Sequence, residues 1–85
     1  MIVKEDCETA PRYVKRVEVV PFSFDHLVTS TFDRRKAKRY GSISEALCAQ
    51  SFAEAWFPGT KWEIWEGRKM WAKGEDGAYG WRARK

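Results

Sequence analysis

Residues that carry catalytic or metal chemistry are scarce in this sequence. Its 85 residues include one histidine and two cysteines, and His26 has neither a cysteine nor a metal-spaced acid near it in the sequence. This scarcity excludes a locally built zinc site or nucleophile–base pair, since each needs several such side chains close together. The acid pairs Glu63 with Glu66 and Glu75 with Asp76 are expected at exposed strand ends and in a turn, where water surrounds them. We therefore predict no enzymatic activity, no cofactor and no bound metal.

Long hydrophobic runs and secretory features are also missing. The longest apolar stretch, Val19–Phe22, is far shorter than the roughly 20 residues that span a bilayer. The first eight residues contain three acids, where a secretory signal has an apolar segment. Cys7 and Cys48 are too few for the disulfide framework of a small secreted domain, so we interpret both as free thiols. These absences predict a cytoplasmic protein without a membrane partner.

Aromatic and basic residues are abundant by contrast. The chain has five Trp, three Tyr and five Phe, and its 16 Lys and Arg outnumber its 12 Asp and Glu to give a net charge of +4. A hydrophobic content of 44% in this length suits one small folded domain. Residues 1–12 show no periodicity and are predicted to form a flexible N-terminal leader, whereas residues 13–85 are predicted to form the domain.

Two N-terminal strands are predicted from β-branched alternation. Apolar residues alternate from Tyr13 to Val19, and their parity then shifts, which predicts a β-bulge near Val20–Pro21. Pro21 cannot donate a ladder hydrogen bond, so this strand lies at an edge or leaves its sheet there. Residues 27–32 are again rich in β-formers and predict a second strand, with a short helix capped by Asp25 as the alternative.

One helix is predicted from Ile43 to Phe57. Ser42 and Glu45 have the spacing of a capping box, and Pro58-Gly59 ends the pattern. At 100° per residue, one apolar arc contains Cys48, Ala49, Phe52, Ala53, Ala55 and Trp56. Cys48 is interpreted as a small buried hydrophobe, and its pairing with His26 in space is the alternative.

The C-terminal third predicts a three-stranded meander over 61–66, 69–73 and 78–84. Two-residue loops at Gly67-Arg68 and Asp76-Gly77 would place Trp65 opposite Met70 and Trp71 opposite Arg82. The face predicted to pack on the helix carries Trp65, Met70, Ala72, Tyr79, Trp81 and Ala83. The opposite face carries Trp62, Ile64, Lys69, Trp71, Lys73, Arg82 and Arg84. A shift of one residue in either loop would exchange these sets.

These elements predict a small single α+β domain. It consists of an N-terminal strand pair, one helix, and a C-terminal three-stranded antiparallel meander packed on the helix. The predicted core residues are Val17, Val19, Phe22, Phe52, Ala53, Trp56, Trp65, Met70 and Trp81.

The strongest functional feature is the positive charge. Five cations fall within the six residues 34–39, and neither a helix face nor a strand face could bury them. A basic loop beside a sheet face with exposed tryptophans suits single-stranded nucleic acid, and Trp, Tyr and Arg are also frequent at protein interfaces. The candidate binding residues are Arg34, Arg35, Lys36, Lys38, Arg39, Tyr40, Trp62, Lys69, Trp71, Lys73, Arg82 and Arg84.

The order of these elements, with a capped helix that ends in Ala55-Trp56-Phe57-Pro58-Gly59, resembles small proteins of phages and mobile elements. Among these are anti-CRISPR inhibitors of multi-subunit bacterial effectors. The resemblance covers most of residues 13–85 in element order and identifies no binding residue. It implies a non-enzymatic protein that occupies a functional surface of a bacterial host protein or nucleoprotein, and hence a location in the host cytoplasm.

Two functions are therefore predicted. The first is a small inhibitor or adaptor that binds a host protein or nucleoprotein through its basic, Trp-rich surface. The alternative is a nucleic-acid-binding module of low sequence specificity, which would use Arg34–Arg39 together with Trp and Arg side chains of the sheet face. Either function is compatible with a monomer or with a homodimer formed through the edge of the meander.

Overall fold

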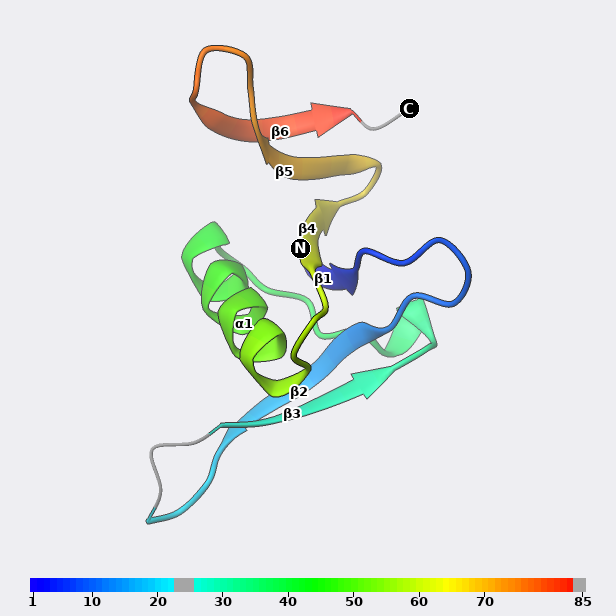
Figure 1. Ribbon diagram of the computed structural model, residues 1–85, viewed down its shortest axis with the longest axis vertical. Helices are drawn as coiled ribbons and strands as arrows, with labels where there is room; N and C mark the ends of the chain where they lie inside the picture. The colour runs from blue at the N-terminus through cyan, green and yellow to red at the C-terminus, as the bar shows by residue number, and fades with distance from the viewer. Residues whose placement is uncertain (23–25, 84–85) are drawn as a thin grey trace.

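In the described part of the chain, a six-stranded antiparallel sheet carries a single α-helix on one of its faces (Figure 1). The structure is a computed structural model that describes residues 1–22 and 26–83. In chain order the elements are β1 (Ile2–Glu5), β2 (Tyr13–Val19), β3 (His26–Thr31), the 3₁₀ helix η1 (Arg34–Lys36), α1 (Ile43–Trp56), β4 (Trp62–Glu66), β5 (Lys69–Lys73) and β6 (Tyr79–Ala83). The strand order β3-β2-β1-β4-β5-β6 confirms the predicted α+β domain, its N-terminal strand pair and its C-terminal meander.

The prediction of a flexible leader is wrong for residues 2–5. These residues form β1, which pairs with both β2 and β4 and thus joins the N-terminal strand pair to the meander. Ile2 and Val3 are buried on opposite faces of the sheet. A strand that is buried on both faces has a short continuous apolar sequence instead of an alternating one. Four residues are also too few to show the two-residue period of a strand.

The hairpin of β2 and β3 forms as predicted, except for its irregularity. Residues 26–31 are a strand, so the helical alternative is wrong. The shift in register lies between Val14 and Arg16, five residues before the bulge predicted at Val20–Pro21. This irregularity lies where β2 diverges from β1, with which it shares the single pair Lys4 and Tyr13.

Ser42 caps α1 as the sequence predicts. Its hydroxyl accepts a hydrogen bond from the Glu45 backbone N–H at 3.3 Å, but the Glu45 carboxylate accepts from the N–H of Gly41 rather than from that of Ser42. The helix ends at Trp56, one residue before the predicted end, and Phe57 is the C-cap. Gly59 then adopts a positive φ of 83°, which redirects the chain toward β4.

Alanines rather than large side chains form the buried face of α1. Ala46, Ala49 and Ala53 recur at helical spacing, and their small size lets the helix lie close to the sheet. Part of the predicted arc is therefore wrong, because Cys48, Ala55 and Trp56 are exposed. Gln50, which lies outside the predicted apolar arc, donates a hydrogen bond to the carbonyl of Trp62 at 2.5 Å.

The second hairpin of the meander is shifted by one residue from its predicted register. Trp65 pairs with Met70 as predicted, but Trp71 pairs with Trp81 and not with Arg82. The loop has three residues, because the Gly74 N–H bonds to the Ala78 carbonyl at 2.8 Å and Gly77 takes a φ of 85°. Such loops are a common alternative to two-residue turns.

The predicted face assignment is wrong for β4 and β5, although their register is as predicted, whereas Trp81 of β6 packs against the main core as predicted. The face covered by α1 carries Trp62, Ile64 and Trp71, which were predicted on the opposite, exposed face. The main core comprises Val3, Val14, Val28, Ala46, Ala49, Ala53, Trp62 and Ile64, with Val17, Phe52 and Trp81 packed against it. Among the other predicted core residues, Val19, Phe22 and Trp56 are exposed, and Met70 is half-buried.

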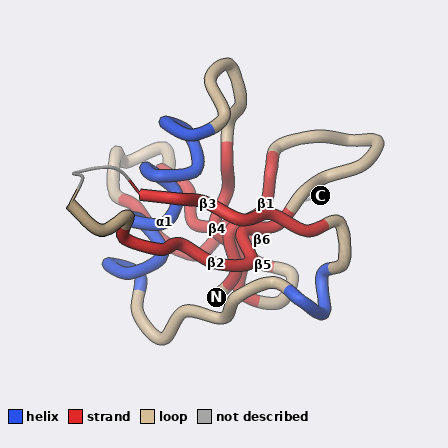
Figure 2. Tube along the Cα trace, turned by 90° about the horizontal axis from the view of Figure 1, so that it is seen from below, coloured by secondary structure: helices blue, strands red, loops and turns tan. Residues whose placement is uncertain are grey.

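A second, smaller cluster lies on the sheet face that α1 does not cover, here called the helix-free face. Ile2, Tyr13 and Ala37 are buried there, and the half-buried Trp65 packs against them. Ala37 immediately follows η1, so this cluster attaches the basic segment to the sheet. In two perpendicular views α1 and η1 lie on opposite sides of the central strands (Figures 1 and 2).

Candidate binding surface

The five cations of the predicted basic segment form an ordered, exposed ridge. We use the name basic ridge for the side chains of Arg34, Arg35, Lys36, Lys38 and Arg39, all of which are exposed. Asp33 caps η1, since its carboxylate accepts from the Arg35 backbone N–H at 2.9 Å. The N–H of Asp33 in turn donates to Thr31 Oγ1 at 3.1 Å, which joins the beginning of the ridge to the end of β3.

The other end of the ridge is held by backbone hydrogen bonds to the sheet. The Lys38 N–H donates to the Val14 carbonyl at 3.0 Å, and the Tyr40 N–H donates to the Met1 carbonyl at 2.7 Å. Residues 38–40 thereby link β2 and β1 where these two strands diverge. With Ala37 buried between the two ends, the backbone positions the cations and leaves their side chains in solvent.

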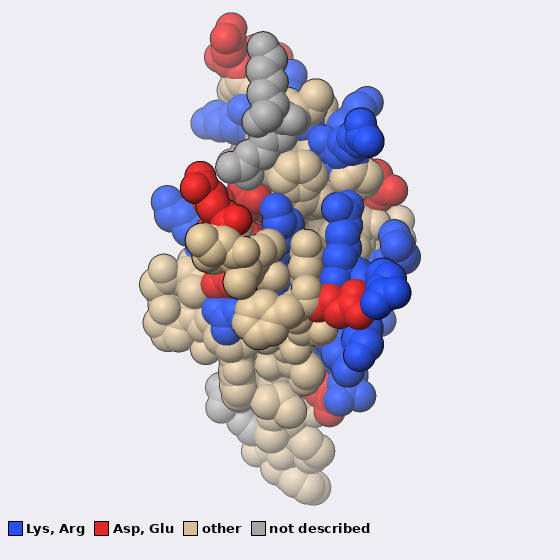
Figure 3. Space-filling view, turned by 90° about the vertical axis from the view of Figure 1, so that its right-hand side faces the viewer, with Lys and Arg blue, Asp and Glu red and all other residues tan. Residues whose placement is uncertain are grey.

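Little negative charge compensates the ridge within its own segment. Asp33 is the one acid within 33–40, and the side-chain and backbone hydrogen bonds from Arg35 hold the pKa of its carboxyl below the usual range. Arg34 bonds to a neutral group, donating to the Gly67 carbonyl at 3.2 Å. The face drawn in Figure 3 has its Lys and Arg side chains gathered along one side, with fewer acids among them. An anionic partner would meet this charge without displacing a dense acidic layer.

Trp65 lies beside the ridge on the helix-free face. The Lys4 Nζ lies 5.1 Å from the centre of its ring, and its indole N–H donates to the Glu63 carboxylate at 3.2 Å. A hollow of about 250 Å³ joins it to the ridge, and its lining includes Arg34 and Arg39. Sequence reasoning missed Lys4 because it fell in the supposed leader, and missed Trp65 because it was assigned to the sheet face that packs on the helix.

Trp62 is not available to a partner. Its side chain is only 3% exposed, because it lies under α1 and stacks on Phe57 with ring centres 5.7 Å apart. Its indole N–H donates to Thr60 Oγ1 at 2.8 Å, so the polar edge of the ring is also satisfied. This residue is structural, contrary to its predicted place on an exposed stacking surface.

Trp71 is half-buried within an aromatic group of the meander. Its ring lies edge-on to Trp81 at 5.3 Å and stacks with Tyr79 at 6.4 Å. Lys69 and Lys73 are exposed on the same side of β5, because they alternate with Met70 and Ala72. These residues lie on the helix-covered side of the sheet, whereas Trp65 and its hollow border the ridge on the other side.

The remaining predicted residues of the meander are Arg82 and Arg84. Arg82 pairs with Met70 on the helix-free side, where its guanidinium lies 3.9 Å from the Asp76 carboxylate and donates to the Ala78 carbonyl at 3.4 Å. Arg84 lies outside the described residues. The predicted residues therefore do not form one continuous surface.

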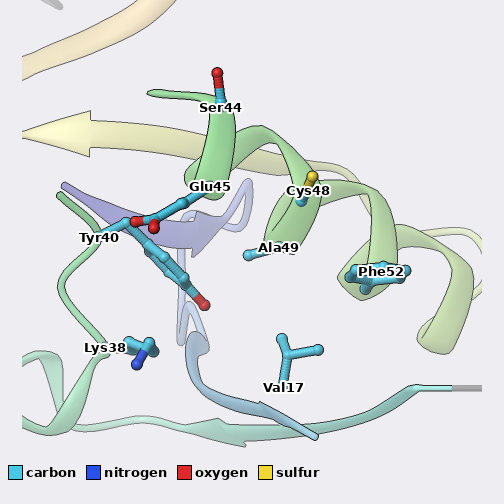
Figure 4. A pocket seen from close by; sticks show the side chains of 8 residues that line it. All are labelled: Val17, Lys38, Tyr40, Ser44, Glu45, Cys48, Ala49 and Phe52. Carbon is cyan, nitrogen blue, oxygen red and sulfur yellow. The ribbon is translucent and has the colours of Figure 1, made fainter. Parts of the chain in front are cut away.

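Tyr40 borders an apolar hollow of about 350 Å³ between α1 and β2 (Figure 4). Val17, Ala49 and Phe52 supply its apolar walls, and Cys48 lies at its helix side. The Tyr40 hydroxyl is buried without a hydrogen-bond partner among the described residues, and burial raises its pKa, with a smaller rise from the Glu45 charge. Tyr40 thus packs against the main core, while its backbone anchors the ridge and its ring centre lies 5.8 Å from the Lys38 Nζ.

The histidine and the two cysteines come from three segments, since His26 begins β3, Cys48 lies in α1 and Cys7 follows β1. His26 stacks on Phe52 with ring centres 3.8 Å apart. Both thiols are free, and backbone hydrogen bonding from Ala10, assisted by Thr9, lowers the pKa of Cys7. Within residues 1–22 and 26–83, no group of three or more His, Cys, Asp and Glu side chains could hold a metal ion. No helix in this same part of the chain is long and apolar enough to cross a membrane.

Comparisons with protein-family models, with curated proteins and with solved structures find no match for this chain. The evidence for function is therefore the surface formed by the basic ridge and its neighbours. That surface combines an ordered row of cations with one half-buried tryptophan on an otherwise uncovered sheet face. This arrangement can attract and orient an anionic surface.

Proposed function

We propose that this chain is a small non-enzymatic binding protein that docks an acidic surface of a protein or nucleoprotein through its basic ridge. By occupying that surface it would act as an inhibitor or an adaptor, the role implied by the resemblance to small phage and mobile-element proteins. Electrostatic complementarity of this kind accelerates the encounter and sets the orientation of the complex.

One observation carries the proposal: the ridge is held at both ends by the fold. The Asp33 cap at its start and the hydrogen bonds of Lys38 and Tyr40 at its end fix the backbone between them. A loop that is already ordered loses less conformational entropy on binding than a flexible one. The fold thus maintains five exposed cations in one arrangement, although their mutual repulsion opposes it.

A protein or nucleoprotein is favoured over bare nucleic acid by the position of the aromatic rings. Nonspecific binding of single strands combines cations with rings on which bases stack. Trp62 is buried under α1, and Trp71 packs with Trp81 and Tyr79. Neither tryptophan of the predicted stacking surface is presented beside the ridge.

Single-stranded nucleic acid is the second candidate, favoured by Trp65. This ring borders the hollow that Arg34 and Arg39 also line, and Lys4 lies close to the ring. A base stacked on Trp65 would hold its phosphates near these cations. Under this alternative, Trp65→Ala would weaken oligonucleotide binding by about 1 to 3 kcal/mol.

Affinity capture from a bacterial lysate, with quantitative mass spectrometry, tests the proposal. The ridge variant replaces Arg34, Arg35, Lys36, Lys38 and Arg39 with glutamine. The matched control replaces five cations elsewhere, namely Lys15, Arg16, Lys61, Lys69 and Lys73, with glutamine, so both variants lose the same charge.

We expect the wild type and the control to retain the same protein partner and the ridge variant to lose it. Nuclease treatment of the lysate should leave a protein partner bound. Equal retention by the ridge variant and the wild type would contradict the proposal. Release of all captured protein by nuclease would favour the nucleic-acid alternative.

A further inference from the structure

The two edge strands of the sheet differ in how they are protected. β3 and β6 end the strand order, so each has a neighbouring strand on one side only in the part of the chain that the structure describes. Open edges present unpaired backbone N–H and C=O groups that can pair with another strand. Natural proteins usually protect such edges with charges, prolines, bulges or short strand length.

β6 has this kind of protection. It is five residues long, it contains Arg82, and it includes Gly80, which weakens a strand interior. The Arg82 guanidinium folds back to the Ala78 carbonyl and toward Asp76 at the end of the hairpin. An incoming strand would meet a cation there.

β3 lacks it. Its six residues, His26–Thr31, contain no Lys, Arg, Asp, Glu, Pro or Gly, and its register against β2 from Val17 to Val19 is regular. Exposed apolar side chains lie along and beside it, since Leu27 is 40% exposed and Phe32 is 69% exposed. Such an edge is a template for pairing, because its outward backbone groups can exchange hydrogen bonds to water for bonds to another strand, and its exposed apolar side chains lose contact with water in an interface.

We propose that β3 pairs antiparallel with β3 of a second copy of this chain, which joins the two sheets into one continuous sheet. A two-fold axis perpendicular to the sheet relates the copies, as in other isologous dimers, so both α1 helices lie on the same side. Side chains opposite each other in an antiparallel pair share a face, so this symmetry pairs residues whose numbers differ by an even amount.

The sequence of β3 suits pairing with itself. With the axis at Thr29, Leu27 lies opposite Thr31 of the second copy, and His26 lies opposite Phe32, so each exposed apolar residue gains a neighbour. A β3 with one charged residue at its centre would oppose that charge to itself across the axis. The absence of charge in β3 removes this penalty, and for this reason a second copy fits better than a basic or acidic peptide strand.

Thr29→Glu tests the pairing with minimal disturbance of the single chain. Thr29 pairs with Arg16 of β2, so the new carboxylate gains an opposite charge within its own chain. In the dimer, however, two glutamates would face each other across the axis. The matched control is Ala83→Glu on β6, which likewise places a carboxylate opposite a cation of its own chain, Lys69.

Sedimentation equilibrium of the wild type, over a range of concentrations, should fit a monomer–dimer equilibrium with a dimer mass of about 20 kDa, twice the chain mass of 10.0 kDa. Thr29→Glu should raise the dimer dissociation constant at least tenfold, whereas Ala83→Glu should leave it within about twofold. A wild type that stays monomeric at millimolar concentration would overturn the proposal. Dimers weakened by Ala83→Glu and unaffected by Thr29→Glu would also overturn it, and would assign the interface to β6.

Amide hydrogen exchange of the wild type gives a test that does not depend on the folding of any variant. Outward-facing amides of β3 should exchange more slowly as protein concentration rises through the dissociation constant. The amides of β6 should show no such change. Concentration-independent exchange along β3 while the protein sediments as a dimer would exclude this edge as the interface.

Discussion

At the scale of single residues, the ion pair of Glu5 and Arg12 is largely shielded from solvent. The two side chains form bidentate hydrogen bonds, at 3.1 Å from Arg12 Nε and 2.8 Å from Arg12 Nη2, and the Glu5 side chain is only 12% exposed. The Arg12 guanidinium also lies 4.3 Å from the ring centre of Phe57. The pair thereby links β1, which contains Glu5, to Phe57 at the end of α1 through the Arg12 guanidinium.

Glu5→Gln should lower the free energy of unfolding at neutral pH by about 1 to 3 kcal/mol, because it weakens a charged hydrogen-bond pair. Hydrogen bonds from the Arg12 side chain lower the pKa of Glu5. The stabilisation is therefore complete above the ordinary pKa of a glutamate, about 4.3, and is lost as the pH falls through the lower folded-state pKa. Urea unfolding at several pH values should show a shallower acid loss for Glu5→Gln than for the wild type.

Glu18→Gln is the matched control for this prediction. Glu18 pairs with Arg16 on the surface of β2, where both side chains are largely exposed. Exposed pairs of this kind contribute about 0 to 1 kcal/mol. If Glu18→Gln proved as destabilising as Glu5→Gln, the special role assigned to the Glu5 pair would be wrong.

Two tryptophans on opposite faces of β4 should respond differently to truncation. Trp62→Ala should cost about 3 to 5 kcal/mol of stability, since it leaves a large cavity under α1. Trp65→Ala should cost less, because that ring is half-buried and belongs to the smaller cluster. Thermal and urea unfolding of both variants would measure the difference, and a larger loss for Trp65→Ala would restore the face assignment predicted from sequence.

At the scale of elements, the first residue of α1 can be predicted from the local sequence alone. Ser42 and Glu45 identify the helix start because the capping hydrogen bond joins residues three apart. Ser42→Ala should lower the free energy of unfolding by about 1 kcal/mol, as measured by urea denaturation. Ser51→Ala, an exposed change within the same helix, is the control and should be neutral or slightly stabilising. Equal losses in both variants would contradict the role of the cap.

The meander shows where local sequence becomes insufficient. Its three strands, its first loop and the pairing of Trp65 with Met70 could be predicted, because Gly67-Arg68 defines a two-residue turn. The second loop, Glu75–Gly77, accepts either two or three residues, and the choice depends on the whole strand pair. A difference of one residue in this loop changes which β6 residues lie opposite β5, so Trp71 pairs with Trp81 instead of Arg82. Trp62 and Trp71 were assigned to the wrong side for a separate reason, because the choice of the face that α1 covers depends on tertiary packing.

The helix faces and β1 were misjudged for a related reason. α1 packs through small alanines, and the apolar side chains of Cys48 and Trp56 remain exposed, so hydrophobicity alone does not identify the buried arc. β1 is a short apolar run whose partners, β2 and β4, are distant in sequence. Both outcomes depend on tertiary packing, which overrides local pattern.

At the scale of the whole molecule, the two faces of the sheet have different tasks. One face is covered by α1 and holds the main core, and the other carries Trp65 and the attachment of the basic ridge. The cationic run itself could be predicted from sequence. The conformation of the basic ridge could not be predicted. Its backbone bonds to atoms of Met1, Val14 and Thr31, which are far from it in the chain or belong to a separate element.

We infer that the ridge attracts an acidic protein surface by charge, and that Trp65 beside it does not serve as a ring on which bases stack. Fluorescence anisotropy of a labelled single-stranded oligonucleotide, titrated with the purified chain at low and near-physiological salt, tests this claim most directly. We expect weak binding at low salt that disappears at near-physiological salt, with tryptophan emission unchanged. Sub-micromolar binding that persists at near-physiological salt and quenches tryptophan emission would contradict it and identify a nucleic-acid-binding protein.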